Sequence, residues 1–246
     1  MKKKFFSSII ENTKTIFYAL IIAVVIRSLF FQPFYIPSSS MEPTLLIGDR
    51  IFVSKYEYGY SKHSFPFSPP LFKERMFDKN PNYGDLVVFK TPADNRTDYI
   101  KRLIGMPGDT IQFKNGKLLL NNSLIPSVKV DAEFKIRCGS YLPDVNAYRE
   151  TLPNGMKYIA VYNKKGTMQN TDTYKVPLNH FFFLGDNRDC SKDSRYLSSV
   201  GYVSKENLVG NAKIIFFSND TISGSVLKFW NWKQSLRIER FFNLLR

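Results

Sequence analysis

The distribution of apolar and polar residues divides the chain into an apolar N-terminal segment and a longer part built of short runs. Residues 15–26 are apolar at almost every position, and after Arg27 and Ser28 the apolar character resumes through residues 29–31. The uninterrupted part is short for a membrane span, which needs about 20 residues. A cleavable secretory signal and a buried core helix therefore compete with a transmembrane anchor. We favour an uncleaved anchor over residues 15–35, because no small-x-small cleavage site follows it.

Basic residues flank the predicted anchor on its N-terminal side. Lys2, Lys3, Lys4 and Lys14 precede it. By the positive-inside rule, residues 1–14 are then cytoplasmic and the rest of the chain is exported. Arg27 is tolerated near the far end of the span, since its long side chain can reach the head groups.

From Pro33 onward the helical periodicity is absent, and short runs of β-branched and aromatic residues alternate with turn residues. This pattern predicts an all-β fold. The candidate strands are residues 50–56, 86–91, 99–104, 110–113, 117–120 and 208–217. Asn115-Gly116 between two of them is a strong signal for a two-residue hairpin. The expected fold class is therefore mainly β, with a core formed by residues 36–122 and 180–220.

Two segments fall outside this core, and one loop interrupts it. Residues 123–179 carry many turn residues and no clear period, so we expect an inserted smaller β lobe, to which no chemistry is assigned. The Pro- and Phe-rich residues 64–72 are too apolar for a solvated linker, and lipid contact and ordinary packing are equally good interpretations. Residues 221–246 mix basic and aromatic residues at near-helical spacing. They predict a C-terminal amphipathic helix at the membrane interface, with a packed terminal helix as the alternative.

Composition narrows the choice of partners. The 35 Lys and Arg residues exceed the 21 Asp and Glu residues, giving a net charge of +14 that favours polyanions such as anionic lipid or nucleic acid. No nucleic-acid module is recognisable, so we expect a phospholipid bilayer and no nucleic acid as partner.

The two cysteines and two histidines of the chain do not form a recognisable set of metal ligands. Cys138 and Cys190 lack CxxC spacing, and His63 and His180 lie in unrelated surroundings, so we expect neither a metal nor a cofactor. The two cysteines could form at most one disulfide. Whether they pair is left open.

Only two histidines are present, which leaves little material for a Ser-His-Asp triad. A lysine can replace the histidine if its pKa falls from about 10.4 by roughly 2 to 3 units, which requires an apolar pocket. Lys101 would share one strand face with Tyr99 and Leu103, while Arg102 on the other face can stay solvated or paired. From this pattern alone such a lysine is more often a solvated edge residue.

Four motifs in order change that assessment. Together they resemble bacterial type I signal peptidase, the membrane-bound leader peptidase, over about residues 26–212. The motifs are Pro37-Ser38-Ser39-Ser40-Met41-Glu42-Pro43-Thr44-Leu45, Gly84-Asp85-Leu86-Val87-Val88-Phe89, Tyr99-Ile100-Lys101-Arg102 with residues 105–109, and Gly185-Asp186-Asn187-Arg188-Asp189 with residues 190–195. Single short motifs mislead easily, whereas four at sensible spacing seldom do.

The resemblance implies a role for each matched position. The implied catalytic roles are Ser40 as nucleophile, Lys101 as general base, Ser38 in the oxyanion hole with the Ser40 backbone N–H, Ser191 as the residue that orients the lysine, and Asp193 with Arg195 as a supporting ion pair. The implied walls of the substrate pocket are Phe34, Ile36, Met41, Leu45, Tyr99 and Ile100. Such walls admit only small residues at the first and third positions before the cut.

Three residues depart from the family pattern without removing a reacting group. Ser39 stands where glycine is common, Cys190 where asparagine is frequent, and Glu42 where the residue is often apolar. A carboxylate near Lys101 would hold the lysine charged and weaken the base. We therefore expect Glu42 to point to solvent.

The resemblance implies a membrane-bound serine endopeptidase that removes signal peptides from exported preproteins after a small-x-small site. Its partners would be preproteins, the bilayer and the secretion translocon. It would be a single-pass protein of the bacterial inner membrane, with a cytoplasmic N-terminus and the catalytic domain on the outer side. Two rivals are a non-enzymatic membrane-anchored β module and a Ser/Lys autoproteolytic repressor-type peptidase, which should be soluble.

Overall fold

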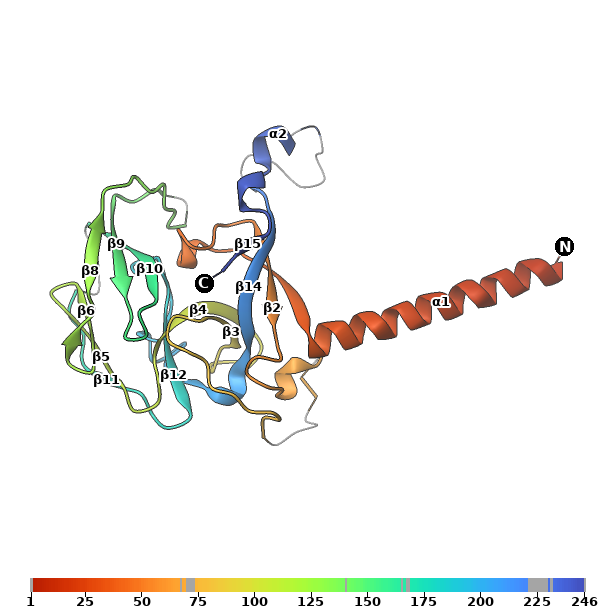
Figure 1. The fold of residues 1–246 in the computed structure, drawn as a ribbon, viewed down its shortest axis with the longest axis horizontal. Helices are drawn as coiled ribbons and strands as arrows, with labels where there is room; N and C mark the ends of the chain where they lie inside the picture. The colour runs from red at the N-terminus through yellow and green to blue at the C-terminus, as the bar shows by residue number, and fades with distance from the viewer. Residues whose placement is uncertain are drawn as a thin grey trace.

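A long N-terminal helix extends away from a β-rich body (Figure 1). The computed structural model describes residues 2–66, 68–69, 74–139, 141–164, 166, 169–220, 230 and 232–245. Helix α1 (Lys2–Leu29) contains a window, Glu11–Leu29, that is long and apolar enough to cross a membrane, and almost none of that window is buried against the body. The mainly β fold with one N-terminal apolar helix is as predicted.

The end of α1 differs from the predicted anchor over residues 15–35. The helix ends at Leu29, and strand β1 (Phe31–Tyr35) follows and pairs antiparallel with β2 (Asp49–Ser54). Pro33 explains the change, because proline cannot donate a helical hydrogen bond and disfavours helix in the residue before it. Proline is tolerated in β1 because β1 is an edge strand.

The main sheet has the strand order β1-β2-β14-β3-β4-β12-β13, with β15 paired to β14. Its further strands are β3 (Leu86–Lys90), β4 (Asp98–Gly105), β12 (His180–Leu184), β13 (Val203–Ser204), β14 (Leu208–Ser218) and β15 (Asn243–Leu244). The four predicted strands in this sheet are confirmed to within two residues at each end. Strand β3 is buried on both faces, since Val87 and Phe89 pack into one hydrophobic cluster and Leu86 and Val88 into another.

Two smaller sheets form a lobe at the opposite end of the body from α1 (Figure 1). One has the order β11-β5-β6-β7 and the other β10-β9-β8. The strands are β5 (Thr110–Lys114), β6 (Lys117–Leu120), β7 (Ser123–Leu124), β8 (Ser127–Val130), β9 (Val145–Thr151), β10 (Lys157–Asn163) and β11 (Tyr174–Lys175). Asn115 and Gly116 both have positive φ, as the predicted hairpin turn requires.

The lobe is therefore larger than residues 123–179. Strands β5 and β6, which the sequence placed in the core, pair with β11 and β7 instead of with the main sheet. The reason is hydrophobic: Ile111, Phe113 and Leu118 pack in one cluster with Leu152 and Tyr158 of the lobe. The same cluster includes residues of β4 and β12, so it joins the lobe to the main sheet.

The C-terminal segment contains less helix than predicted for residues 221–246. Residues 221–229 and 231 lie outside the described residues, and the α-helix among the described ones is α2 (Trp232–Ser235). The 3₁₀ helix η5 (Ile238–Arg240) and strand β15 follow. Arg240 pairs with the buried Asp49 at 2.6 Å, and this pairing holds the segment against the main sheet. The predicted lipid contact of residues 64–72 falls partly on residues 67 and 70–72, which also lie outside the described part.

Candidate active site

The predicted nucleophile lies on a tight turn after β1. Residues Ser39–Met41 form the 3₁₀ helix η1, preceded by Ser38 in extended conformation. Asn187 clamps this turn: its backbone N–H donates to the Ser40 carbonyl at 3.2 Å, and its Nδ2 donates to the Ser39 carbonyl at 3.0 Å. The last of the four motifs therefore fixes the first.

Strand β4 brings Lys101 to the hydroxyl of Ser40. Lys101 Nζ lies 2.5 Å from Ser40 Oγ and donates to the carbonyl of Ile100 at 3.0 Å. Both side chains belong to buried residues, with 4% of Lys101 and 8% of Ser40 exposed. The amine also lies 5.5 Å from the centre of the Tyr99 ring, as expected for residues sharing a strand face. Residues 61 positions apart thus form the predicted pair.

The surroundings of Lys101 favour its neutral form. Burial lowers the pKa of the amine from 10.5 to about 8, while the carboxylates of Asp193 and Asp186 oppose the shift and Arg195 adds to it. The size of the shift agrees with the 2 to 3 units that a lysine base near neutral pH requires. An amine with this pKa is partly neutral near pH 7 to 8 and can accept a proton from a hydroxyl.

Glycine at position 185 allows the last motif, which contains Ser191, to approach the first motif, which contains Ser40. A Cβ at Gly185 would lie 2.2 Å from Ser191 Oγ and 2.5 Å from the Ser40 carbonyl oxygen. Ser191, which was predicted to hydrogen-bond Lys101, is thus brought next to the nucleophile turn. Its Oγ is buried, and the structure does not bond it to Lys101.

The predicted supporting ion pair is present. Arg195 Nε donates to Asp193 at 2.8 Å, and both side chains are buried. Burial raises the pKa of the Asp193 carboxyl, but the charge and hydrogen bonds of Arg195, together with hydrogen bonding from Gly185 and Ser191, hold the pKa below its ordinary value. Asp193 also accepts from the Gly185 N–H at 3.0 Å, which ties the pair to the site.

A second buried ion pair was not assigned from the sequence. Arg102, on the face of β4 opposite Lys101, donates to both carboxylate oxygens of Asp186, at 2.8 and 2.7 Å. The hydroxyl of Thr44 donates to the same carboxylate at 2.5 Å. The motifs could have indicated this pair, since Thr44, Arg102 and Asp186 each belong to one of the four motifs.

The lobe is anchored to the site by a third buried pair, which sequence reasoning missed. Arg188 donates to Glu150 of β9 at 2.7 Å, and Tyr158 and Tyr162 of β10 donate to the same carboxylate at 2.5 and 2.6 Å. The main chain of Arg188 in turn accepts a hydrogen bond from Arg195. A chain of polar contacts therefore runs from the lobe to the supporting ion pair.

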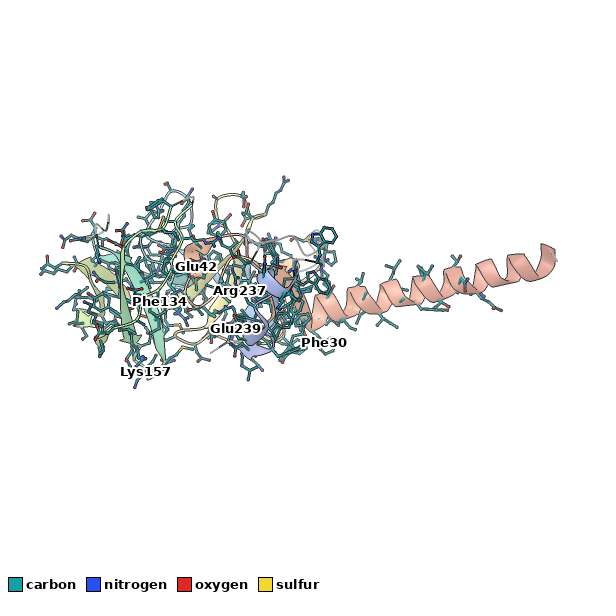
Figure 2. All side chains as sticks on the ribbon, turned by 90° about the horizontal axis from the view of Figure 1, so that it is seen from above. Phe30, Glu42, Phe134, Lys157, Arg237 and Glu239 are labelled. Atoms are coloured by element: carbon teal, nitrogen blue, oxygen red, sulfur yellow. A yellow bond between two sulfur atoms is a disulfide. The ribbon has the colours of Figure 1, made fainter. Side chains whose placement is uncertain are left out.

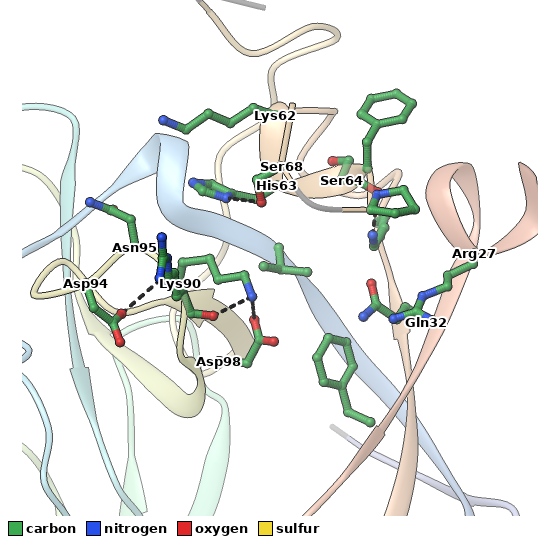
Figure 3. Close-up of a pocket in the computed structure, with 16 residues that line it drawn as sticks. Arg27, Gln32, Lys62, His63, Ser64, Ser68, Lys90, Asp94, Asn95 and Asp98 are labelled. Carbon is green, nitrogen blue, oxygen red and sulfur yellow. Dashed lines mark hydrogen bonds and ion pairs between the residues drawn. The ribbon is translucent and has the colours of Figure 1, made fainter. Parts of the chain in front are cut away.

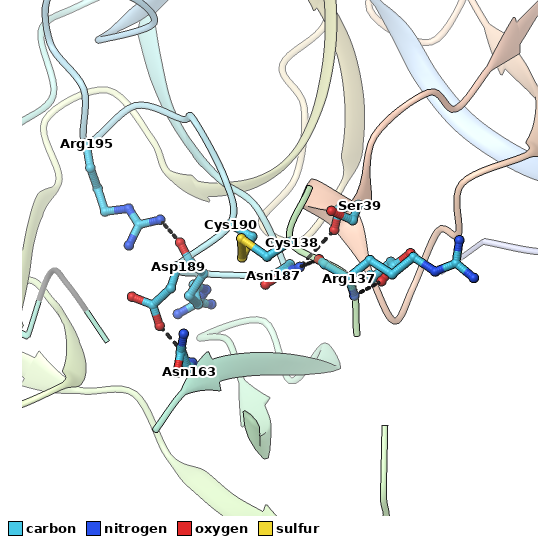
Figure 4. Close-up of a disulfide and its surroundings, with 10 residues drawn as sticks. Ser39, Arg137, Cys138, Asn163, Asn187, Asp189, Cys190 and Arg195 are labelled. Atoms are coloured by element: carbon cyan, nitrogen blue, oxygen red, sulfur yellow. Dashed lines mark hydrogen bonds between the residues drawn. A yellow bond between two sulfur atoms is a disulfide. The ribbon is translucent and has the colours of Figure 1, made fainter. Parts of the chain in front are cut away.

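A disulfide joins the lobe to the same loop (Figure 4). Cys138 and Cys190, whose pairing the sequence left open, are bonded with their Cα atoms 5.4 Å apart. Cys190 directly precedes Ser191. Close to the disulfide, Asn187 Nδ2 donates to the carbonyl of Arg137 at 3.0 Å. A disulfide and a hydrogen bond therefore hold this part of the lobe against the site.

A pocket of about 410 Å³ opens beside the Ser40 hydroxyl. Of the six predicted wall residues it is lined by Phe34, Ile36, Tyr99 and Ile100, and Ser38 and Ser40 line it as well. Met41 and Leu45 do not line the pocket. Both are fully buried in the hydrophobic cluster with Val53 and Ile51, and Ile51 also lines the pocket. Ser38 is exposed, with its Oγ 3.4 Å from Ser40 Oγ.

The expectation that Glu42 points to solvent is wrong. Only 3% of Glu42 is exposed, and its carboxylate accepts a hydrogen bond from the Arg137 N–H at 2.8 Å; Figure 2 shows Glu42 within the β-rich body, away from α1. Burial raises the pKa of this carboxyl. The lobe covers the residue, which the sequence could not indicate. The charges acting on Lys101 are those of Asp193, Asp186 and Arg195 instead.

In the part of the chain that the structure describes, no group of three or more His, Cys, Asp or Glu side chains is arranged to hold a metal ion. The site consists of a hydroxyl, a buried amine and polar groups that position them.

Comparison with known proteins identifies the family to which the chain belongs. The profile of the family described as signal peptidase, peptidase S26, matches residues 9–217. Signal peptidase I of Rickettsia conorii is 40% identical over 247 residues, covering 93% of this chain and 90% of the relative, and that of Rickettsia bellii is 37% identical over 254 residues, covering 96% and 85%. A crystal structure of a signal peptidase I from Enterococcus faecalis has 23% identity and a TM-score of 0.32, covering 54% of this chain and 97% of that one. The chain therefore belongs to the signal peptidase family, peptidase S26, and is a serine endopeptidase of that family.

Proposed function

We propose that this endopeptidase is membrane-anchored and removes signal peptides from exported preproteins, with Ser40 as nucleophile and Lys101 as general base. The observation that carries the proposal is the distance of 2.5 Å between Lys101 Nζ and Ser40 Oγ, combined with burial of the amine and a pKa of about 8. A serine hydroxyl is a poor nucleophile until a neighbouring base takes its proton. The amine is the group within reach of Ser40 Oγ that can do so.

The proposed reaction is acyl transfer. Ser40 Oγ attacks the scissile carbonyl while neutral Lys101 takes its proton, and the resulting ammonium protonates the leaving amine. The oxyanion is stabilised by the Ser40 N–H and the Ser38 hydroxyl, and one such donor contributes about 3 kcal/mol. Water that Lys101 deprotonates then hydrolyses the acyl-enzyme. Ser191 is proposed to orient the amine, because its buried hydroxyl lies beside the nucleophile turn.

The sheet offers a way to hold an extended substrate. Strand β1 is an edge strand, and residues 98–101 of β4 pair with β3 on one side while β12 pairs with β4 only from Arg102 onward. Both stretches line the pocket beside Ser40. A peptide added there as a strand would make main-chain hydrogen bonds, and its alternate side chains would enter the apolar pocket. The apolar walls of this pocket are proposed to favour small side chains before the cut.

Two observations support the proposed localisation in the bacterial inner membrane with the catalytic domain on the outer side. Lys2, Lys3 and Lys4 precede the apolar window Glu11–Leu29 of α1, and Lys14 lies near its start, which favours a cytoplasmic N-terminus. The disulfide between Cys138 and Cys190 suits an oxidising compartment outside the cytoplasm. In this orientation the active site would meet preproteins as they leave the translocon.

The test uses the full chain solubilised in detergent and incubated with a preprotein. Ser40→Ala and Lys101→Met should each abolish cleavage, and Lys175→Met should not, because Lys175 is an exposed lysine of β11 in the lobe. Cleavage by Lys101→Met at the wild-type rate would refute the proposed base. A lipid-binding module without activity would be indifferent to all three substitutions.

A further inference from the structure

A second pocket, of about 540 Å³, is lined on one side by Arg27 from the end of α1 (Figure 3). Phe34 and Asp98 line both pockets, which makes them neighbours. The charged side chains that line the second pocket are those of Arg27, Lys55, Lys62, Lys90, Arg96, Asp94 and Asp98. Five cations thus face two carboxylates, and the pocket carries an excess of positive charge. We call it the basic pocket.

The two carboxylates of the basic pocket are already engaged. Asp98 pairs with Lys90 at 2.8 Å, and Asp94 accepts hydrogen bonds from the hydroxyls of Thr91 and Thr97 at 2.6 and 2.5 Å. The remaining four cations, those of Arg27, Lys55, Lys62 and Arg96, have no carboxylate partner among the described residues. The described part of the chain therefore supplies too few carboxylates to neutralise the excess charge of the pocket.

Two buried groups in the basic pocket are incompletely paired among the described residues: the ammonium of Lys55 forms no salt bridge, and one ring nitrogen of His63 has no hydrogen bond. Only 2% of Lys55 is exposed, and its ammonium donates to the Ser64 carbonyl at 2.6 Å. Burial lowers its pKa to about 8. Only 5% of His63 is exposed; its Nδ1 bonds to Ser68 Oγ at 2.9 Å, while its buried Nε2 has no hydrogen-bond partner among the described residues. A buried cation without a counter-ion is costly, and an anion in the pocket would remove that cost.

The basic pocket is fixed to the end of the apolar helix. The Lys55 N–H donates to the carbonyl of Phe30 at 3.0 Å, and the hydroxyl of Tyr60 donates to the carbonyl of Leu29 at 2.8 Å. Phe30, Phe31 and Tyr56 are exposed beside it. Exposed aromatic rings at the end of a membrane span favour the head-group layer. The pocket therefore opens where the chain would leave the bilayer.

We propose that the basic pocket binds the phosphate of an anionic phospholipid head group, and so holds the substrate pocket close to the membrane surface. The proposal rests on the proposed membrane insertion of α1. A phosphate accepts hydrogen bonds from several donors at once, which fits a lysine ammonium, a guanidinium and an imidazole around one cavity. A zwitterionic head group carries its own cation, which the excess positive charge of the pocket repels.

The test measures lipid binding to the detergent-solubilised full chain by native mass spectrometry, with phosphatidylglycerol and phosphatidylcholine as the two probes. Phosphatidylglycerol should bind with one site and phosphatidylcholine much more weakly. Lys62→Gln and Arg96→Gln each remove one exposed pocket cation. Each substitution alone should weaken phosphatidylglycerol binding about fivefold, and the double variant roughly 25-fold. Lys55→Met, which removes the buried ammonium at similar volume, should weaken it at least as much as one exposed cation.

The matched control is Lys129→Gln with Lys157→Gln. It removes the same charge from exposed positions on β8 and β10, and Lys157 lies at the end of the body opposite α1 (Figure 2). This pair should leave phosphatidylglycerol binding unchanged. If both double variants weakened phosphatidylglycerol binding equally, the effect would be one of general charge, and the proposed lipid site would be refuted.

A second arm separates lipid from free phosphate. Inorganic phosphate should not displace phosphatidylglycerol at equal concentration; displacement would overturn the lipid assignment. Preprotein cleavage is measured separately on the same proteins, so an inactive protein that still binds phosphatidylglycerol through the pocket would refute the proposed function and not the lipid site. Active protein that binds both lipids equally would refute the lipid site alone.

Discussion

A methyl group at position 185 should disable the enzyme without unfolding it. In Gly185→Ala the new Cβ would lie 2.2 Å from Ser191 Oγ, 2.4 Å from Ser191 Cβ and 2.5 Å from the carbonyl oxygen of Ser40. Non-bonded heavy atoms pack at about 3.5 to 4 Å, so these contacts require a displacement of roughly 1 Å. The Ser40 carbonyl is part of the nucleophile turn, and the turn must therefore move.

The size of the effect follows from that displacement. A misplacement of about 1 Å at a reacting group costs on the order of 100-fold in rate. Overpacking a buried position costs typically about 1 to 3 kcal/mol of unfolding free energy, which a domain with cores on both faces of its main sheet can tolerate. We therefore expect kcat to fall by about 100-fold or more while the protein stays folded.

The assay is the initial rate of preprotein cleavage in detergent, with thermal unfolding measured on the same samples. Gly155→Ala is the control: Gly155 has φ +81° and no atom within 4 Å of its added Cβ, so it carries backbone strain without a clash. It should lose about 1 kcal/mol of stability and keep the wild-type rate. A wild-type rate for Gly185→Ala would refute the close approach of Gly185 to Ser191 and to the Ser40 carbonyl.

Four further predictions address the base, the oxyanion hole, the buried carboxylate and the disulfide. The kcat/KM of cleavage should rise with pH and level off above about pH 8, since only neutral Lys101 accepts a proton; a flat profile from about pH 6 to about pH 9 would contradict this. Ser38→Ala should lower kcat by about 100-fold, equivalent to about 3 kcal/mol, and leave the midpoint of that profile in place. Glu42→Met should cost about 1 to 3 kcal/mol of unfolding free energy because the Arg137 N–H loses its acceptor, and an acid-shifted pH profile would show instead that Glu42 acts on the base. Cys138→Ser opens a link across 52 residues and should cost about 4 kcal/mol in denaturant unfolding; unchanged stability would count against the link.

The strands and the reacting pair could be predicted because their signals are local. Runs of β-branched and aromatic residues bounded by turn residues located β2, β3, β4, β5, β6 and β14, and Asn115-Gly116 indicated the hairpin. Ser40 and Lys101 were found by the order of the motifs, because no local pattern distinguishes a catalytic lysine from a solvated one.

What the sequence could not supply is mostly long-range packing. The burial of Glu42 depends on the lobe main chain at Arg137, 95 positions away. Met41 and Leu45 belong to the matched motif, yet they face the core, because only the three-dimensional turn decides which side chains of the motif reach the pocket. The extent of the lobe was underestimated for the same reason, since a hairpin signal does not say which sheet the hairpin joins.

The most direct measurement of the central claim is the titration of the Lys101 amine itself, followed by NMR of protein with isotope-labelled lysine. The Ser40→Ala variant is used so that the protein does not cleave anything during the titration. Because the pKa of Lys55 also falls to about 8, the signal is assigned by its loss in Lys101→Met. We predict a pKa of about 8 for Lys101; a pKa at the ordinary lysine value of 10.5 would contradict its role as the base.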